Sequence, residues 1–180
     1  IKVDKTFPSK NKLFKSKSGD GKWRHVMYDS DFGFERWGAN PFNIGSYETY
    51  NMLDHAIGES NVFNNPVWST AVFTTFLENM DFRNKFINTY CDRLNTTYST
   101  ENTLYFMDSL RTIIEPYISN HINRYGPDIY DLFTPNTMGE YNSVYQGMEN
   151  FANYRPDNAR NEMVEMFGLS GSSNTISLYM

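Results

Sequence analysis

The sequence predicts an α+β fold that is mostly α, in which an N-terminal β-hairpin is followed by a helical body. Near the N-terminus, aromatic and β-branched residues flank a polar, glycine-containing connection, as in a hairpin. From residue 66 onward, apolar residues recur at three- and four-residue steps, which is the period of a helix. A chain of 180 residues with 39% hydrophobic content suits a single domain with a real core.

The predicted hairpin has strands over residues 11–14 and 23–28, joined by a turn over residues 16–21. The second strand leads into Asp29 and Asp31, and Gly33 then permits an abrupt change of direction. Several glycines and an Asn-Pro pair follow, which predicts an irregular, loop-rich passage to about residue 65. Loops of that length inside compact domains tend to be functional.

Five helices are expected after this passage, over residues 66–80, 82–95, 99–118, 138–154 and 156–168. The third begins at a Ser99 cap, and Pro116 predicts a kink or a break in it. Its apolar stripe is expected to contain Leu104, Met107, Leu110 or Arg111, Ile114 and Ile118. Pro156 suits the first turn of the fifth helix, and Gly168 suits its end.

Composition excludes several classes of function. The net charge of -5 argues against a nucleic-acid-binding protein, which normally needs a basic excess to meet phosphate. No segment is apolar over the length that a membrane-spanning helix requires. The single cysteine, Cys91, falls within a helical pattern and is expected to be a buried, inert thiol.

Asp29 and Asp31 are the strongest candidates for chemistry. Residues two apart in an extended strand share a face, so these two carboxylates point the same way and repel each other. A divalent cation such as Mg²⁺ would relieve that repulsion, whereas the simpler alternative is a solvated acidic turn. Antiparallel pairing would bring Asn11, at the entrance of the first strand, to the same end of the hairpin. Together these three residues could form an oxygen-rich Mg²⁺ site for a nucleotide triphosphate.

Arg155 and Arg160 offer a second candidate, on either side of Pro156. If a helix begins there, they could contact an anion at its N-terminus. A plain helix start, with Asp157 in the first turn, explains the same residues.

Residues 14–17 and 21–34 resemble the strand and Asp-x-Asp signature of the CotH family. These are kinase-like proteins first known from bacterial spore coats and also found in secreted multidomain proteins. Residues 79–86, 93–98 and 154–169 resemble the helical half of the same family. The resemblance covers roughly residues 7–169, and its specificity lies in the combination of segments.

The resemblance implies the C-terminal lobe of an atypical protein kinase, with a kinase-C-lobe-like helical bundle, that transfers phosphate from ATP to Ser residues. Asp29 would be the metal-binding aspartate and Asn11 the metal-binding asparagine, with Asp31 beside them and Mg²⁺ or Mn²⁺ as the cofactor. The family's catalytic aspartate lies five residues before the asparagine, where this chain has Thr6. Threonine cannot accept a proton as a carboxylate does, so Asp4 is the remaining candidate for the catalytic base.

Two functions therefore stay open. One is a kinase domain acting on a secreted or surface protein; the other is a non-catalytic module that binds a partner protein or a glycan. The resemblance implies an extracellular, cell-surface or spore-coat location. Residues 1–169 would form the lobe and residues 170–180 a linker with the first strand of another domain, while the ATP-gripping N-terminal lobe is expected to be missing. This chain alone is then expected to have little or no kinase activity.

Overall fold

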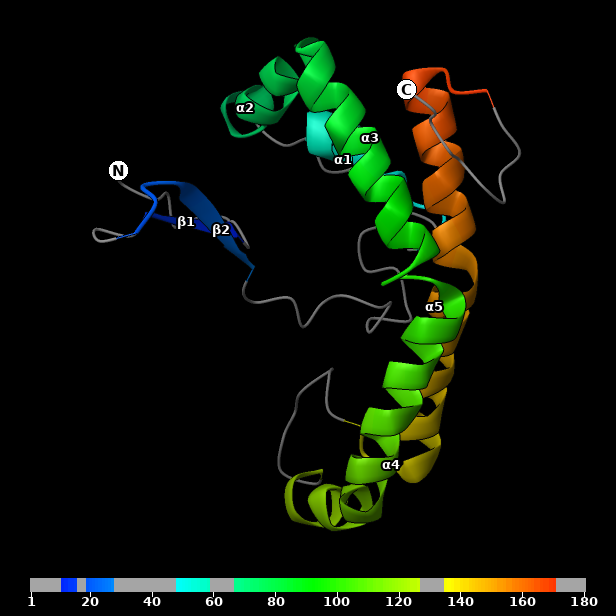
Figure 1. The fold of residues 1–180 in the computed structure, drawn as a ribbon. Coiled ribbons are helices and arrows are strands. Elements are labelled where there is room, and N and C mark those ends of the chain that lie inside the picture. The colour runs from blue at the N-terminus through cyan, green and yellow to red at the C-terminus, as the bar shows by residue number, and fades with distance from the viewer. Residues whose placement is uncertain (1–10, 16–18, 28–47, 59–66, 127–134, 171–180) are drawn as a thin grey trace.

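The computed structural model describes residues 11–15, 19–27, 48–58, 67–126 and 135–170. Strands β1 (Asn11–Lys15) and β2 (Trp23–Met27) pair in antiparallel register. Helices follow in the order α1 (Met52–Ile57), α2 (Val67–Glu78), α3 (Met80–Asn95), α4 (Thr100–Tyr125) and α5 (Met138–Phe167) (Figure 1).

The expected α+β class is wrong, because the described residues are mostly helical and the strands do not form a layer of the fold. Five helices of 6, 12, 16, 26 and 30 residues stand against two strands of five residues each. Within the described part of the chain, β1 and β2 contact each other but none of the helices. An α+β fold needs its helices to cover a sheet, so this body is an all-α arrangement.

The helices form an extended arrangement around α5, in place of the compact bundle that was expected. Helix α3 packs against the C-terminal half of α5, while α4 packs against its N-terminal half, so that α3 and α4 follow one another along the longer helix (Figure 1). The short helices α1 and α2 lie beside α3 at the upper end. This architecture gives the body two separate cores, one in each half.

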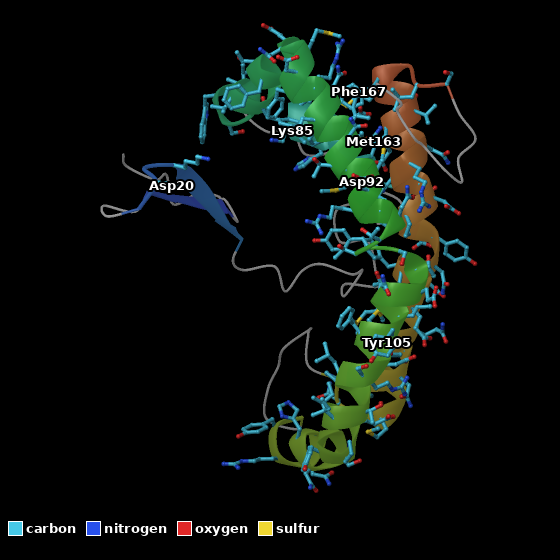
Figure 2. The ribbon with its side chains drawn as sticks, viewed as in Figure 1. Asp20, Lys85, Asp92, Tyr105, Met163 and Phe167 are labelled. Carbon is cyan, nitrogen blue, oxygen red and sulfur yellow. The ribbon has the colours of Figure 1, made fainter. Side chains whose placement is uncertain are left out.

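The first core lies where α1, α3 and α5 meet. Leu53, Ile87 and Cys91 are buried there around Met163, which is fully buried between α3 and α5 (Figure 2). The ring of Phe86 lies 6.1 Å from that of Phe167, which closes this core at its outer edge. Burying side chains of this size contributes about 1.5–3 kcal/mol each, so this core is the main attachment of α3 to α5.

The second core joins α4 to α5. Met107 from α4 packs against Tyr145 and Ala152 from α5, and Leu104 and Met148 are half-buried beside them. Leu104 and Met107 are thus inward-facing, as the sequence predicts.

The predicted α4 stripe is wrong at Ile114, and of the two alternatives Leu110 and Arg111 it is Arg111 that packs inward. Leu110 and Ile114 are 62% and 47% exposed, whereas Arg111 is half-buried at the contact with α5. Arg111 packs inward because α5 carries tyrosine rings opposite it: the Arg111 guanidinium lies 4.1 Å from the centre of the Tyr145 ring. A guanidinium stacks on such a ring, so the polar alternative left open by the sequence is the one that packs inward.

Helix α1 corrects the expectation of irregular structure up to residue 65. The Asn51 side chain accepts hydrogen bonds from the backbone N–H groups of Leu53 and Asp54, at 3.0 Å each, and so caps the first turn. Gly58 ends the helix in the left-handed conformation at φ 84°, which favours glycine. The remaining residues of that passage, 34–47 and 59–65, lie outside the described residues.

Helix α5 is continuous through Pro156, so the two helices predicted over residues 138–154 and 156–168 are one. Proline lacks the N–H that would bond to the carbonyl four residues earlier, which belongs to Ala152. The Thr100 hydroxyl of α4 donates a hydrogen bond to that carbonyl at 3.0 Å. A side chain from the neighbouring helix therefore replaces the missing backbone donor. The periodicity of the α5 sequence alone does not indicate this replacement.

Helix α4 likewise continues through Pro116 without a break and reaches Tyr125. Its start agrees with the sequence, since the Ser99 hydroxyl accepts a hydrogen bond from the Asn102 N–H at 3.3 Å. No helix within the described ranges has a stretch both long and apolar enough to cross a membrane. Residues 171–180, which carry the predicted final strand, lie outside the described residues.

Candidate functional site

The register of the hairpin locates Asn11, one of the three predicted metal ligands, on β1. Asn11 is the first residue of β1 and pairs with Met27, the last residue of β2. Asp29 follows Met27 by two residues in the sequence. The start of β1 and the end of β2 therefore lie side by side.

The other predicted site residues cannot be located in the same way. Asp4, Thr6, Asp29 and Asp31 lie outside the described residues, so the metal site and the catalytic base stay predictions. Among the residues that are described, no three His, Cys, Asp or Glu side chains are grouped so that they could hold a metal ion.

A buried ion pair on α5 dominates the polar chemistry of the helical body. Arg155 and Glu162 form a two-pronged pair, in which Nη2 of Arg155 lies 2.8 Å from Oε2 of Glu162 and Nη1 donates to Oε1. Their side chains are 12% and 7% exposed. Such planar, bidentate geometry is the strongest form of this interaction.

Arg155 also holds the chain that precedes α1. Its Nη1 donates to the main-chain carbonyls of Glu48, at 3.3 Å, and Tyr50, at 3.0 Å. The Asn158 amide, one turn further along α5, donates to the same Glu48 carbonyl at 2.8 Å. We call Arg155, Asn158 and Glu162 the α5 clamp, because together they fix residues 48–50 to the longest helix.

Tyr90 of α3 lies next to the clamp. Burial raises the pKa of its phenol, and the neighbouring Arg155 guanidinium offsets part of that increase. A phenol with a raised pKa stays protonated at neutral pH, so Tyr90 is a neutral neighbour of the ion pair. It also lines an open hollow of 360 Å³ on α3, together with Phe86, Thr89, Arg93, Leu94 and Tyr98. This lining contains neither a carboxylate nor a histidine, so it offers no general base of the kind that phosphoryl transfer uses.

A second polar cluster joins α4 to α5. The Tyr145 hydroxyl donates to Oδ1 of Asp108 at 2.8 Å, while Arg111 lies over the Tyr145 ring and donates to Glu115 and Asn142. Burial raises the pKa of Tyr145 to about 12, and the hydrogen bond to Asp108 adds to the shift. The Tyr145–Asp108 and Arg111–Asn142 hydrogen bonds both run between α4 and α5, so this cluster fastens the two helices together.

The prediction that Cys91 is buried is confirmed. Its side chain is 4% exposed in the first core. Burial raises the pKa of the thiol, and the nearby Asp92 carboxylate raises it further. A protonated, buried thiol is a poor nucleophile.

Both interpretations of Arg155 and Arg160 as residues of a helix start are wrong, since α5 is continuous there. Arg160 pairs with Asp157 at 2.7 Å and also donates to the Asn95 side chain and the Leu94 carbonyl at the end of α3. Neither Asn158 nor Glu162 is indicated as a functional residue by the sequence. The signal that could have found them is the unbroken helical spacing of Tyr145, Met148, Ala152, Ala159 and Met163 across Pro156.

Comparison of the sequence with models of protein families identifies the family of this chain. The model of the family described as CotH kinase protein matches residues 2–159. No curated protein and no solved structure matches the chain. The match spans the hairpin, the 28–47 stretch and all five helices except the last turns of α5. The chain therefore belongs to the CotH kinase family.

Proposed function

We propose that this chain is part of a protein kinase that binds ATP with Mg²⁺ or Mn²⁺ and transfers phosphate to Ser residues of secreted or surface proteins. Membership of the CotH kinase family supports a kinase-like function. The observation that carries the proposal furthest is the hairpin register, in which Asn11 pairs with Met27, two residues before Asp29.

The proposed donor set fits a hard cation. An amide oxygen and two carboxylates are the kind of ligands that Mg²⁺ prefers, and Mg²⁺ is commonly bound by one or two carboxylates together with substrate phosphates. Asn11, Asp29 and Asp31 would hold the ion, which would supply positive charge to neutralise the phosphates of the nucleotide. Two adjacent carboxylates without a cation would repel each other, which gives their pairing a physical reason.

Asp4 is the proposed catalytic base, because Thr6 stands at the position where the family has its aspartate. A base must lie within hydrogen-bond reach of the hydroxyl whose proton it accepts. On this proposal, in a polypeptide that also carries the N-terminal lobe, an Asp4→Asn variant loses phosphoryl transfer and keeps metal-dependent nucleotide binding. A Thr6→Ala variant of the same polypeptide retains both.

Calorimetric titration of the chain with ATP and Mg²⁺ tests the nucleotide site. We expect metal-dependent heat that is lost in Asp29→Asn. Asp20→Asn is the matched control, because Asp20 lies at the turn end of the hairpin, where it accepts a hydrogen bond from the Lys22 N–H. Equal loss of heat in both variants would point to damage to the hairpin and would contradict the proposed ligand role.

A non-catalytic scaffold is the second candidate, and one observation favours it. An outward row on α4 is apolar and exposed: Phe106 61%, Leu110 62%, Ile113 66%, Ile114 47% and Tyr117 69%. Contiguous apolar surface of this kind commonly marks an interaction site. A partner protein or glycan would then be held by aromatic and aliphatic side chains. A folded chain that gives no heat with ATP and either metal would favour this candidate over the kinase.

A further inference from the structure

Helix α4 has two apolar faces, and α5 covers one of them. Leu104 and Met107 belong to the second core, on the α5 side. The other face carries five exposed side chains, which we call the α4 row: Phe106, Leu110, Ile113, Ile114 and Tyr117. At about 100° per residue, the centre of this row lies roughly 130° around the helix from the contact with α5. Within the described part of the chain, α4 packs against no element other than α5.

The charged residues of α4 lie on the α5 side. Asp108 and Arg111 bond to side chains of α5, and Glu115 pairs with Arg111. These three are the only charged residues in the stretch 102–120, so the side of the α4 row carries none. A surface helix normally turns its charged residues to water and its apolar residues to the core. The opposite arrangement is what we expect of a helix whose outer face is also buried, in a contact with another molecule.

The chemistry of the α4 row selects the class of partner. Helices that lie on a membrane surface carry Lys and Arg beside their apolar face, and the row has neither. A glycan needs several hydrogen-bond partners, whereas the row supplies a single hydroxyl, that of Tyr117. A protein with its own uncharged apolar face fits the row best.

The α4 row is complementary to itself. Phe106, Leu110, Ile113 and Tyr117 are spaced by four, three and four residues, which is the spacing of the seam between two packed helices. Their order is aromatic, aliphatic, aliphatic, aromatic, and it reads the same in both directions. In an antiparallel pair of α4 helices, Leu110 therefore meets the partner's Ile113, and Phe106 meets the partner's Tyr117. Such a contact repeats about a two-fold axis, as a symmetric dimer requires.

The exposed area is large enough for a dimer of moderate affinity. The exposed fractions of the α4 row add up to about three fully exposed large side chains, or roughly 600 Å² per copy at about 200 Å² each. Two copies would then bury roughly 1,200 Å², which is the lower end of the range for specific interfaces. Exposed Asn102 and Asn120 lie beside the two ends of the row and would form a polar rim.

We propose that the α4 row is a homodimer interface, through which two copies of this chain pack antiparallel. A second copy is then the occupant of the surface that favours the scaffold candidate. The inference does not rest on nucleotide binding, because none of its residues belongs to the proposed metal site. Titration with ATP and measurement of the dimer therefore succeed or fail independently.

Sedimentation equilibrium tests the dimer, with the 180-residue chain at concentrations from about 1 to about 200 µM. We expect a monomer–dimer equilibrium with a micromolar Kd. Leu110→Glu should raise that Kd at least about 10-fold, because it places an unpaired carboxylate near the centre of the interface. Val72→Glu is the matched control: Val72 is 65% exposed on α2, compared with 62% for Leu110, and the dimer should be unaffected. Circular dichroism checks that each variant is folded.

A pair of complementary variants tests the antiparallel register. Leu110→Lys and Ile113→Glu should each weaken the dimer when studied alone. When the two chains are mixed, the lysine of one lies opposite the glutamate of the other, while the remaining Leu110 and Ile113 still meet. The mixture should therefore form a heterodimer at concentrations where neither variant associates with itself.

Three results would overturn the proposal. The first is an unaltered chain that stays monomeric over the whole concentration range. The second is a dimer that Leu110→Glu leaves unchanged, or that Val72→Glu weakens equally. The third is a failure of the mixed variants to associate, which would exclude the antiparallel contact of Leu110 with the partner's Ile113.

Discussion

The hydrogen bond from the Thr100 hydroxyl is predicted to contribute more to the free energy of unfolding than an ordinary surface hydrogen bond. Its acceptor is a carbonyl that Pro156 leaves without a helical donor. The hydroxyl donates to the Ala152 carbonyl at 3.0 Å, and Ala152 is 3% exposed. A Thr100→Val variant keeps the shape and removes the donor. Leaving a buried acceptor unsatisfied costs about 1–3 kcal/mol, so we expect the free energy of unfolding to fall by that amount.

A double-mutant cycle tests the cause of this loss. Pro156→Ala restores a backbone N–H at position 156, which can bond to the Ala152 carbonyl in the usual helical manner. In that background the Thr100→Val substitution should cost less than about 0.5 kcal/mol, since the carbonyl keeps a partner. The two substitutions should therefore couple by about 1 kcal/mol or more, which is characteristic of residues that share one hydrogen-bonded group.

The assay is urea unfolding followed by circular dichroism, with each free energy extrapolated to water. For a chain of this size, each kcal/mol also shifts the melting temperature by about 2–4 °C. Thr112→Val is the matched control, because the Thr112 hydroxyl bonds to the Asp108 carbonyl within α4 and is exposed. An equal cost of Thr100→Val with and without Pro156 would refute the reasoning.

Three further predictions follow from the cores and the ion pair. Because the pKa of Tyr145 is raised to about 12, its ionisation should be centred near pH 12 in a spectrophotometric titration, and stability should fall as pH rises from about 10 to 12. Tyr145→Phe should reduce that alkaline loss, and Tyr90, whose pKa is also raised, should account for part of what remains. Cys91 should react with a thiol reagent only as fast as the chain opens, since it is buried and its pKa is raised. Glu162→Ala should cost about 3–5 kcal/mol in urea unfolding, because it leaves the Arg155 charge buried without its partner, and a cost below 1 kcal/mol would contradict this account.

Helix positions were largely predictable, because local signals determined them. The apolar spacing in α3 and the Ser99 cap of α4 act over a few residues, and the structure places both elements where the sequence predicts them. The continuity of α5 could not be predicted from α5 alone. It depends on Thr100, which lies 52 residues from the carbonyl it serves.

The fold class failed for a related reason. Strand and helix patterns in a sequence indicate elements, but an α+β fold also requires helices that cover a sheet, and no such contact occurs between the described strands and helices. The inward position of Arg111 in place of Leu110 likewise depends on what α5 presents to α4. Contacts between distant segments decide these features.

The candidate functional residues also fall into two groups: those that local sequence patterns indicate and those that only the folded structure brings together. The sequence indicates Asn11, Asp29 and Asp31 because amide and carboxylate side chains lie near the ends of a predicted hairpin. The observed register pairs Asn11 with Met27, as that hairpin requires. The sequence indicates Arg155 as a candidate anion contact at a helix start, whereas α5 is continuous at this position. Its partners lie at Glu162, seven residues along α5, and at carbonyls more than 100 residues away, so only the folded structure brings the clamp together.

We propose that this chain binds a nucleotide through a metal held by Asn11, Asp29 and Asp31. The most direct test is calorimetric titration with ATP in the presence and absence of Mg²⁺, using the unaltered chain and Asp29→Asn. We expect heat that requires the metal and disappears in Asp29→Asn, while Asp20→Asn behaves like the unaltered chain. Metal-independent heat, or equal binding by Asp29→Asn, would contradict it.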